Sequence, residues 1–283
     1  NTTQGRFFQF TNPDGIENIS RLGAHADFIL ILLTPFYLIW SDPRMLLIIQ
    51  TIVIALGCFF VYKISLNVLK NKNISLILGI SYLLNPLVQR QNLYDFHAIT
   101  FATTFLLGAF YYLNIKRYYL FSIFLILAVL TKENVYIIAG LFGILLFTKG
   151  KKIAGTLLFI GGLITFYVLV SYIIPGARGT EHFAVEFYGP FGDSPKEILL
   201  NILKNPLKII ALIFSPSQIQ YLKVNFLHTG FLSFTSPFYL IFTAPDFAIS
   251  LLSTNQNLRE IWYHYAASII PFVYISTIFG ISY

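Results

Sequence analysis

Charged residues are scarce in this chain. Only 11% of its 283 residues are Asp, Glu, Lys or Arg, and 56% are hydrophobic, whereas a soluble domain carries roughly 25% charged residues. A soluble chain of this length needs far more polar surface to cover itself. The excess apolar residues must therefore face lipid, and the composition predicts an integral membrane protein.

Cysteine is almost absent as well, since Cys58 is the single one and lies inside an apolar run. No disulfide within the chain is possible, and the C-x-x-C and H-E-x-x-H zinc patterns do not occur. The short alternating segments of a membrane β-barrel are also missing, because the apolar runs are continuous. The remaining fold class is all-α, a multi-pass transmembrane helical bundle.

The sequence has no initiator Met and no signal-like segment at its start. It begins at Asn1 and stops inside an apolar run at Tyr283. We therefore expect it to be a fragment of a longer protein.

The net charge of +7 would suit nucleic acid, but its distribution does not. Basic residues gather in three short linkers between apolar runs, and no acidic residue lies within them: Lys63, Lys70 and Lys72; Lys116 and Arg117; Lys149, Lys151 and Lys152. This is the positive-inside pattern of membrane insertion. We expect a lipid bilayer as partner and no nucleic acid, and the sequence leaves the oligomeric state open.

A spanning helix needs about 20 apolar residues, with roughly 17–25 tolerated. Six apolar runs predict transmembrane helices over 44–174, namely 44–62, 74–88, 97–115, 118–131, 134–148 and 153–174. If the three lysine-bearing linkers are cytoplasmic, the linkers 86–97, 131–134 and 175–197 lie on the outer face.

The flanking segments complete one transmembrane domain. Residues 1–43 predict an outer loop and an interfacial or re-entrant helix that His25 opens, HADFILILLTPFYLIW. Residues 175–218 predict an outer loop and an amphipathic helix broken at Pro206. Residues 219–283 predict C-terminal transmembrane helices. Within them, 219–253 is either a span with a re-entrant piece or a tight hairpin, and 262–283 is a span.

With this topology, ionisable residues gather on the outer face. They are Arg21, His25, Arg90, Asp95, His97, Lys132, Glu133, Glu181, His182 and Glu186, and His264 joins them if 219–253 is a hairpin. Ionisable groups near a membrane are costly and often functional. Most of these lie at helix ends, where the cost is small.

Asp95 and His97, in NLYDFHAIT, allow two interpretations. They are either a helix cap with a first-turn histidine, or a general base or metal ligand beside a phosphate or metal contact. Lys132 and Glu133 are either a solvated loop pair or a phosphate partner and a carboxylate held below the lipid surface.

Three further residues are candidates for binding substrate. His25 is either a neighbour of the helix cap or a ligand. His264, between two tyrosines, is either an aromatic-belt residue or part of the site. Arg90 could contact a phosphate.

Stretches along nearly the whole chain carry a family resemblance: NTTQGR, HADFILILLTPFYLIW, NLYDFHAI, LTKENV, YGPFGDSP and YHYAASIIPF. The sequence resembles a domain-of-unknown-function family of prokaryotic multi-pass membrane proteins, related to the GT-C glycosyltransferase superfamily. These stretches are specific for the family and for no activity.

The resemblance implies an active site on the non-cytoplasmic face, between interfacial helices and outer loops. It implies a lipid-linked phosphosugar donor, an acidic catalytic base and, in some members, a divalent metal. The histidine that opens the interfacial helix resembles His25, the second outer loop resembles the stretch with Asp95, and the start of a late helix resembles YHY. In the related family an acidic loop precedes the NTTQGR stretch, so its catalytic base is expected before Asn1.

Three functions are compatible with these features. The first is a transferase with a polyprenyl-phosphate sugar donor, in which Asp95 and Glu133 are catalytic and His25, Arg90, His97, Lys132 and His264 bind substrate. The second is a transporter or flippase, for which Asp246 is the acid placed deepest. The third is an assembly subunit without chemistry. The need for a metal stays open.

Overall fold

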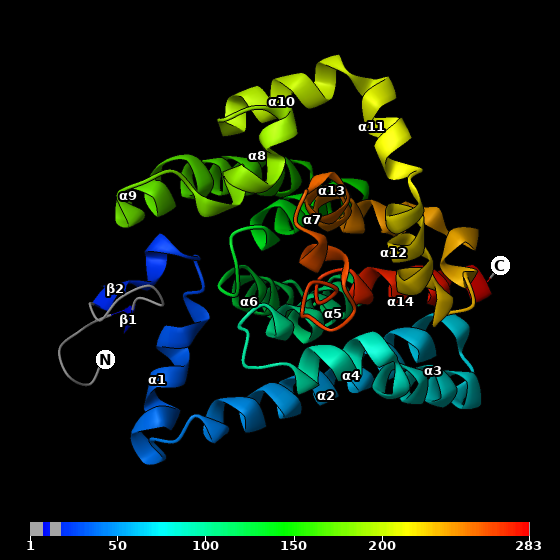
Figure 1. Ribbon diagram of the computed structural model, residues 1–283. Helices are drawn as coiled ribbons and strands as arrows, with labels where there is room; N and C mark the ends of the chain where they lie inside the picture. Colours follow the sequence, from blue (N-terminus) through cyan, green and yellow to red (C-terminus); the bar gives the residue numbers. More distant parts are fainter. Residues whose placement is uncertain (1–7, 12–17, 283) are drawn as a thin grey trace. The chain divides into compact units, whose positions relative to one another are not determined.

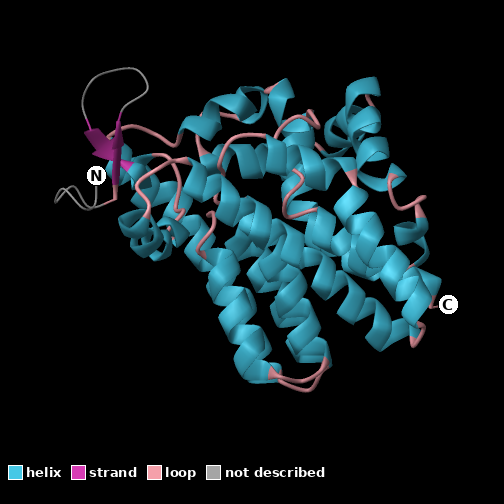
Figure 2. Ribbon diagram, turned by 90° about the horizontal axis from the view of Figure 1, so that it is seen from below, coloured by secondary structure: helices cyan, strands magenta, loops and turns pink. Residues whose placement is uncertain are grey.

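The computed structural model describes residues 8–11 and 18–282, and these are almost entirely helical (Figure 2). The all-α prediction is confirmed. One short antiparallel hairpin, β1 (Gln9–Thr11) and β2 (Asn18–Ser20), pairs Phe10 with Ile19. We expected a plain loop here, and the hairpin corrects that expectation, because aromatic and β-branched residues favour paired strands. The NTTQGR stretch lies outside the described residues.

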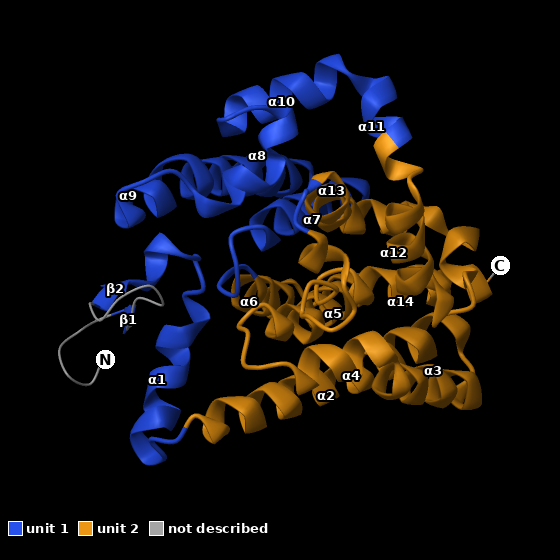
Figure 3. Cartoon of the chain, viewed as in Figure 1, with its two compact units in different colours: residues 1–42, 129–211, 253–255 blue, residues 43–128, 212–252, 256–283 orange. Residues whose placement is uncertain are grey.

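The chain divides into two compact units (Figure 3). Unit 1 comprises residues 1–42, 129–211 and 253–255, and unit 2 comprises residues 43–128, 212–252 and 256–283. Each unit is therefore assembled from segments that are distant in the sequence, and each brings its own set of polar residues together.

The first part of unit 2 follows the predicted apolar runs closely (Figure 1). Its helices are α2 (Arg44–Leu69), α3 (Lys72–Leu84), α4 (Pro86–Leu93), α5 (Thr100–Asn114) and α6 (Tyr118–Val129). The predicted stop at Asn85 is confirmed, because Asn85 ends α3 and its Oδ1 accepts from the Leu87 amide at 2.9 Å to cap α4.

Three features of this part differ from the prediction: α4 lies in the predicted linker 86–97, α5 starts at Thr100 and not at residue 97, and α2 ends later. Helix α2 does not end at Lys63 but continues to Leu69, where Lys70 takes the left-handed conformation with φ 54°. Lys63 is tolerated inside the helix because its ammonium lies 5.3 Å from the centre of the Phe59 ring, which is a cation–π contact.

The second part of unit 2 consists of shorter elements. They are α12 (Pro216–Leu227), the 3₁₀ helices η5 (Leu232–Thr235) and η6 (Pro237–Thr243), α13 (Ala244–Leu252), η7 (Gln256–Arg259) and α14 (Ile270–Ile281). The break predicted at Ser236 is present. The break predicted at Ala244 is absent, because Ala244 has helical backbone angles and η6 passes directly into α13. The span predicted over 262–283 is shorter than expected, since α14 begins at Ile270 and Pro271 favours a first helical turn.

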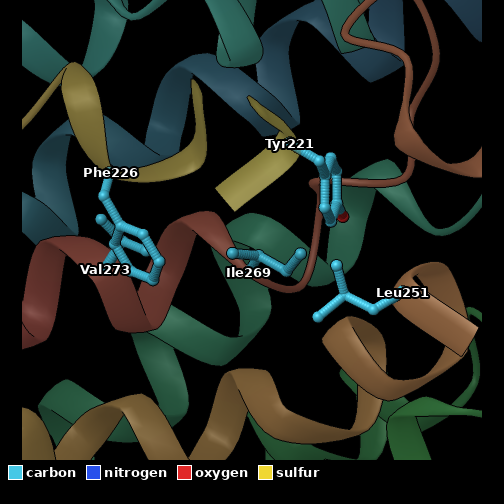
Figure 4. Packing of buried hydrophobic residues seen from close by; sticks show 5 residues of the cluster. All are labelled: Tyr221, Phe226, Leu251, Ile269 and Val273. Carbon is cyan, nitrogen blue, oxygen red and sulfur yellow. The ribbon is translucent and has the colours of Figure 1, made fainter. Parts of the chain in front are cut away.

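A buried cluster joins these elements in unit 2 (Figure 4). Tyr221 and Phe226 come from α12, Leu251 from α13, and Ile269 and Val273 from the start of α14, all at most 6% exposed. Among membrane helices such side chains stabilise the fold through van der Waals packing against one another. The cluster therefore holds α12, α13 and the start of α14 together.

Unit 1 contains α1 (Ile29–Ile39), α7 (Val135–Thr148), α8 (Lys152–Val168), α9 (Ile174–Arg178), α10 (Pro195–Lys204) and most of α11 (Pro206–Ile213). The break predicted at Pro206 is confirmed. The run 153–174 extends further than predicted, because a π-helical turn (Leu169–Ile173) carries the chain past Pro175 into α9.

Glycines allow α7 and α8 to pack closely. A side chain at Gly143 of α7 would clash with the carbonyl oxygen of Gly155 in α8, and one at Gly162 would press on the backbone of Gly140. Small residues at such a contact are typical of helix pairs in membranes, where close approach of the backbones provides the packing energy.

Within residues 8–11 and 18–282, two helical stretches are long and apolar enough to cross a membrane, Arg44–Leu69 and Lys152–Arg178. Their most apolar 18-residue segments have mean hydropathy 2.4 and 2.3, and 33% and 17% of the residues in these segments are buried. The shorter apolar helices, among them α3, α6, α7 and α14, have 10–17 residues. Large exposed side chains such as Ile52, Leu56, Leu157 and Ile164 leave both long helices with apolar outer faces, as lipid contact requires.

Candidate functional site

In unit 1, a carboxylate and a histidine from distant segments form a pair. The Glu133 Oε1 lies 2.9 Å from His25 Nδ1, and its Oε2 accepts from the Ala26 amide at 3.1 Å. The prediction that His25 opens the helix is wrong, because α1 begins at Ile29, four positions after His25. The helix starts late because the Ala26 and Ile29 amides bond to Glu133 and to the Leu130 carbonyl instead.

The Glu133 side chain is only 7% exposed, and that of His25 is 25% exposed. Burial by itself raises the pKa of Glu133, but the charge and hydrogen bond of His25, followed by Lys132, outweigh it and hold that pKa well below its usual range. An ionised carboxylate only accepts hydrogen bonds. His25 must therefore donate from Nδ1, and its second nitrogen, Nε2, is left to act on other groups.

His182 completes this cluster from the loop that follows α9. Its Nδ1 accepts from the Ala184 amide at 3.1 Å and caps the 3₁₀ helix η4 (Phe183–Phe191). Burial lowers the pKa of His182 to about 4, with Glu133 opposing the shift. The Phe183 ring stacks on His182 with centroids 4.9 Å apart and meets His25 edge-on at 5.4 Å.

A second ion pair holds the chain before α1 in place. Arg21 donates from Nε to Asp27 Oδ2 at 2.9 Å, and Asp27 is 3% exposed. Such a buried, charge-assisted contact fixes the strand-to-helix connection on which His25 lies. His25 is therefore positioned from both sides, by Asp27 along the chain and by Glu133 across it.

In unit 2, the loop between α4 and α5 carries Asp95 and His97. Its backbone is held by Gln50 of α2, which is fully buried and accepts from the His97 amide at 3.0 Å and from the Thr100 hydroxyl at 3.2 Å. The Gln50 amide group also donates to the Asn92 carbonyl at 3.4 Å. One uncharged side chain thus anchors the whole loop to the helix.

The side chains of this loop form a polar and aromatic cluster. Asp95 Oδ1 lies 2.7 Å from His97 Nδ1, with the Asp95 side chain 72% exposed. The His97 ring stacks on that of His264, centroids 3.7 Å apart at 21°, and on Tyr94 at 5.1 Å. Arg90 of α4 lies over the Trp262 ring, 3.8 Å from its centre.

The structure thus sorts the seven predicted site residues into two sets. His25, Lys132 and Glu133 come together in unit 1, and Arg90, Asp95, His97 and His264 come together in unit 2. Neither Asp95 nor His97 lies in the first turn of α5, which begins at Thr100 with no side-chain cap bond. The helix-cap interpretation of Asp95 is therefore wrong.

Gln50 and Trp262 were missed by sequence reasoning, and His182 was placed among the outer-face residues but not among the predicted site residues. Gln50 carried a signal, since it is an uncharged polar residue inside the apolar run 44–62. Polar residues inside such runs usually form hydrogen bonds with other polar groups of the protein. His182 carried none, because the loop that surrounds it is of mixed character. Among the described residues, no group of three or more His, Cys, Asp or Glu could hold a metal ion.

These features define an all-α protein with apolar helices of membrane-spanning length and a polar cluster in each unit. The chain belongs to the family described as "Predicted membrane protein (DUF2079)", whose model matches residues 1–283. No curated protein and no solved structure matches it. The family and the membrane character are thereby established, and the activity has to be argued from the sites.

Proposed function

We propose that this protein is a GT-C-type glycosyltransferase that uses a lipid-phosphate-linked sugar at the non-cytoplasmic face of a cell membrane, which the chain crosses several times. The observation that carries the proposal is the pair of His25 and Glu133, in which a buried carboxylate fixes a partly exposed imidazole. A histidine oriented in this way through one nitrogen is the usual form of a general base.

The reaction assigns a separate role to each member of the pair. In its neutral form, with the ring proton on Nδ1, His25 takes the proton of an acceptor hydroxyl at Nε2, and the hydroxyl oxygen forms a bond to the anomeric carbon of the donor sugar. The bond between that carbon and the phosphate oxygen breaks, and the lipid phosphate leaves with the electron pair. Glu133 stabilises the resulting imidazolium, and the Lys132 ammonium, next to Glu133 in the chain, contacts the phosphate.

The cluster in unit 2 supplies further groups of the same kinds. Arg90 and His97 offer positive or hydrogen-bonding groups for a phosphate, His264 supports the His97 ring, and the exposed Asp95 carboxylate can accept from a hydroxyl. The polar groups of both units are the ones that a phosphosugar and a hydroxyl acceptor need.

The distribution of lysines supports the outer location of the sites. Gln50 of α2, which holds the loop with Asp95, lies 20 residues before Lys70, the residue that follows the end of α2. This separation is roughly 30 Å along a helix, which is about the hydrocarbon thickness. In unit 1, Glu133 precedes α7, and Lys149 follows its far end.

The test is to profile membrane glycolipids by mass spectrometry in cells that carry the full-length protein or its variants. We expect His25→Ala and Glu133→Gln to abolish the accumulation of a glycolipid and Asp95→Asn to reduce it. The exposed carboxylate Glu260 provides the matched control, since Glu260→Gln makes the same chemical change outside both clusters. An unchanged profile for His25→Ala, with normal protein levels, would contradict the proposal.

A transporter is the second candidate, and one observation favours it. Asp246 of α13 is 6% exposed, and the buried side chains Gln218 and Asn225 lie in the same unit. Buried ionisable groups among apolar helices commonly mark a transport pathway. If Asp246→Asn, and not His25→Ala, changed the glycolipid profile, transport or flipping would be the better assignment. If neither did, a non-catalytic assembly subunit would remain.

A further inference from the structure

A cavity of about 410 Å³ lies in the outer loop of unit 1, within the range of small-molecule sites. Its walls come from the segment 178–193, including Arg178, Glu181, His182, Glu186 and Asp193. None of these residues belongs to the pair of His25 and Glu133. The Phe183 ring lines the cavity and touches His25, so the cavity lies directly beside that pair.

The cavity has a defined frame. The loop starts at Gly179, with φ 80°, and ends at Gly192, with φ 146°, backbone conformations that favour glycine. Three bonds from outside hold η4: the Thr254 amide to the Phe187 carbonyl at 2.8 Å, Asn201 to Phe191 at 2.7 Å, and Lys208 to Pro190 at 3.4 Å. The walls are therefore fixed by partners outside the loop itself.

The charges of the cavity are unbalanced. Glu181, Glu186 and Asp193 line it, and within the described part of the chain none of them forms an ion pair. Arg178 is the one cation of the lining, and it is already engaged with the Thr180 hydroxyl at 3.1 Å and with the Phe183 ring. The cavity therefore attracts hydrogen-bond donors and positive groups and repels anions.

One buried group of the lining lacks a partner. The His182 Nδ1 accepts a hydrogen bond from Ala184, so the proton of the neutral ring lies on Nε2. His182 is 6% exposed, and its Nε2 has no hydrogen-bond partner among the described residues. A buried donor without an acceptor is unfavourable, and a ligand oxygen that reached Nε2 would satisfy it.

We propose that this cavity binds the saccharide acceptor and prefers an amine-bearing sugar. Sugar hydroxyls donate to the carboxylates of Glu181, Glu186 and Asp193, and a protonated amino group balances their negative charge. A ring or hydroxyl oxygen accepts from His182. As an acceptor site it rests on the proposed function, but sugar binding can be measured apart from transfer. The contact of Phe183 with His25 brings such a ligand next to the proposed base.

The test uses the full-length protein in lipid nanodiscs and three methyl glycosides, of glucosamine, glucose and glucuronic acid. Their affinities are measured by titration with saturation-transfer NMR. We expect the affinities to fall in that order, with about tenfold between the first and the last, which corresponds to about 1.4 kcal/mol from one or two partly screened charges. Equal affinities, or no binding of any of the three, would overturn the proposal.

A pair of variants locates the binding. Glu181 and Glu186 are exposed, so Glu181→Gln with Glu186→Gln should leave folding intact and remove most of the preference for glucosaminide. Glu260→Gln, outside the cavity, should leave it unchanged. A preference that survives the double variant would overturn the assignment. Binding without glycosyl transfer would contradict only the proposed function, and transfer without this preference would contradict only the acceptor site.

Discussion

Each unit of the molecule holds one carboxylate–histidine pair joined through the histidine Nδ1, and the two pairs differ in how much water reaches the carboxylate. Glu133 lies 2.9 Å from His25 with 7% of its side chain exposed, whereas Asp95 lies 2.7 Å from His97 with 72% exposed. The two distances are nearly equal. Since water screens an exposed pair, only the buried one can contribute strongly to stability.

The two histidines are consequently held by different forces. His25 depends on the charge of Glu133, whose other oxygen is also occupied, by the Ala26 amide. His97 depends on ring stacking with His264 and on the amide of Gln50, which fixes its backbone. A carboxylate beside a histidine therefore has a structural role in unit 1 and is free to meet a ligand in unit 2.

The largest effect is expected from breaking the buried pair. Glu133→Ala leaves His25 without its counter-charge and the buried Ala26 amide without an acceptor. We expect a loss of about 3 kcal/mol in the free energy of unfolding, at the low end of the range for broken buried pairs because His25 is partly exposed. Denaturant unfolding of the purified protein in detergent measures it. Glu133→Gln, which keeps an acceptor for Ala26 but removes the charge, should lose less; equal losses would show that the hydrogen bond to Ala26 contributes nothing.

A second, smaller loss is expected in unit 2 from the uncharged anchor. Gln50→Leu keeps the size of the side chain but removes the acceptor of the His97 amide and the Thr100 hydroxyl. Leaving buried donors unpaired costs roughly 1–3 kcal/mol, so we expect about 2 kcal/mol by the same measurement. Gln89→Leu is the matched control, because Gln89 is exposed and its side chain forms one hydrogen bond, from Nε2 to the Leu83 carbonyl. If both variants lost the same stability, Gln50 would not be the anchor.

The helices of both units could be predicted because local signals define them. Continuous apolar runs mark α2, α5 and α8. At the end of α3, the Asn85 side chain caps the next helix and the Pro86 ring begins it. The late start of α1 could not be predicted in the same way. It depends on bonds from Ala26 and Ile29 to residues more than 100 positions away, and no local pattern reports such bonds.

The candidate sites show the same limit. Counting helix ends placed His25, Glu133, Asp95 and His97 on one face, but the pairing of one histidine with Glu133 and of the other with Asp95 needed coordinates. Burial needed them too, because both carboxylates lie in polar linkers of similar sequence character. The sequence therefore indicated which residue types would matter and not which of the two pairs is buried.

Acid should weaken unit 1 through His182. Its pKa is lowered to about 4 by burial from the usual 6.5, so the unfolded chain binds a proton below pH 6.5 that the folded chain does not. Stability is therefore complete above pH 6.5 and falls toward pH 4, by about 1 kcal/mol between pH 7 and 5.5. The lowered pKa of Glu133 acts in the same direction at lower pH. Unfolding of His182→Gln over the same range should show a smaller loss; an equal loss would assign the effect to other groups.

The smallest effect on stability is expected from Asp95→Asn, although this change removes the charge of the second pair. Because Asp95 is 72% exposed, water already screens its attraction to His97, and such pairs contribute about 0–1 kcal/mol. We expect a change below about 0.5 kcal/mol, together with a reduced glycolipid signal. The decisive measurement compares the loss of stability in Asp95→Asn with that in Glu133→Ala. Equal losses would mean that Asp95 also stabilises the fold, and the contrast between the buried and the exposed pair would disappear.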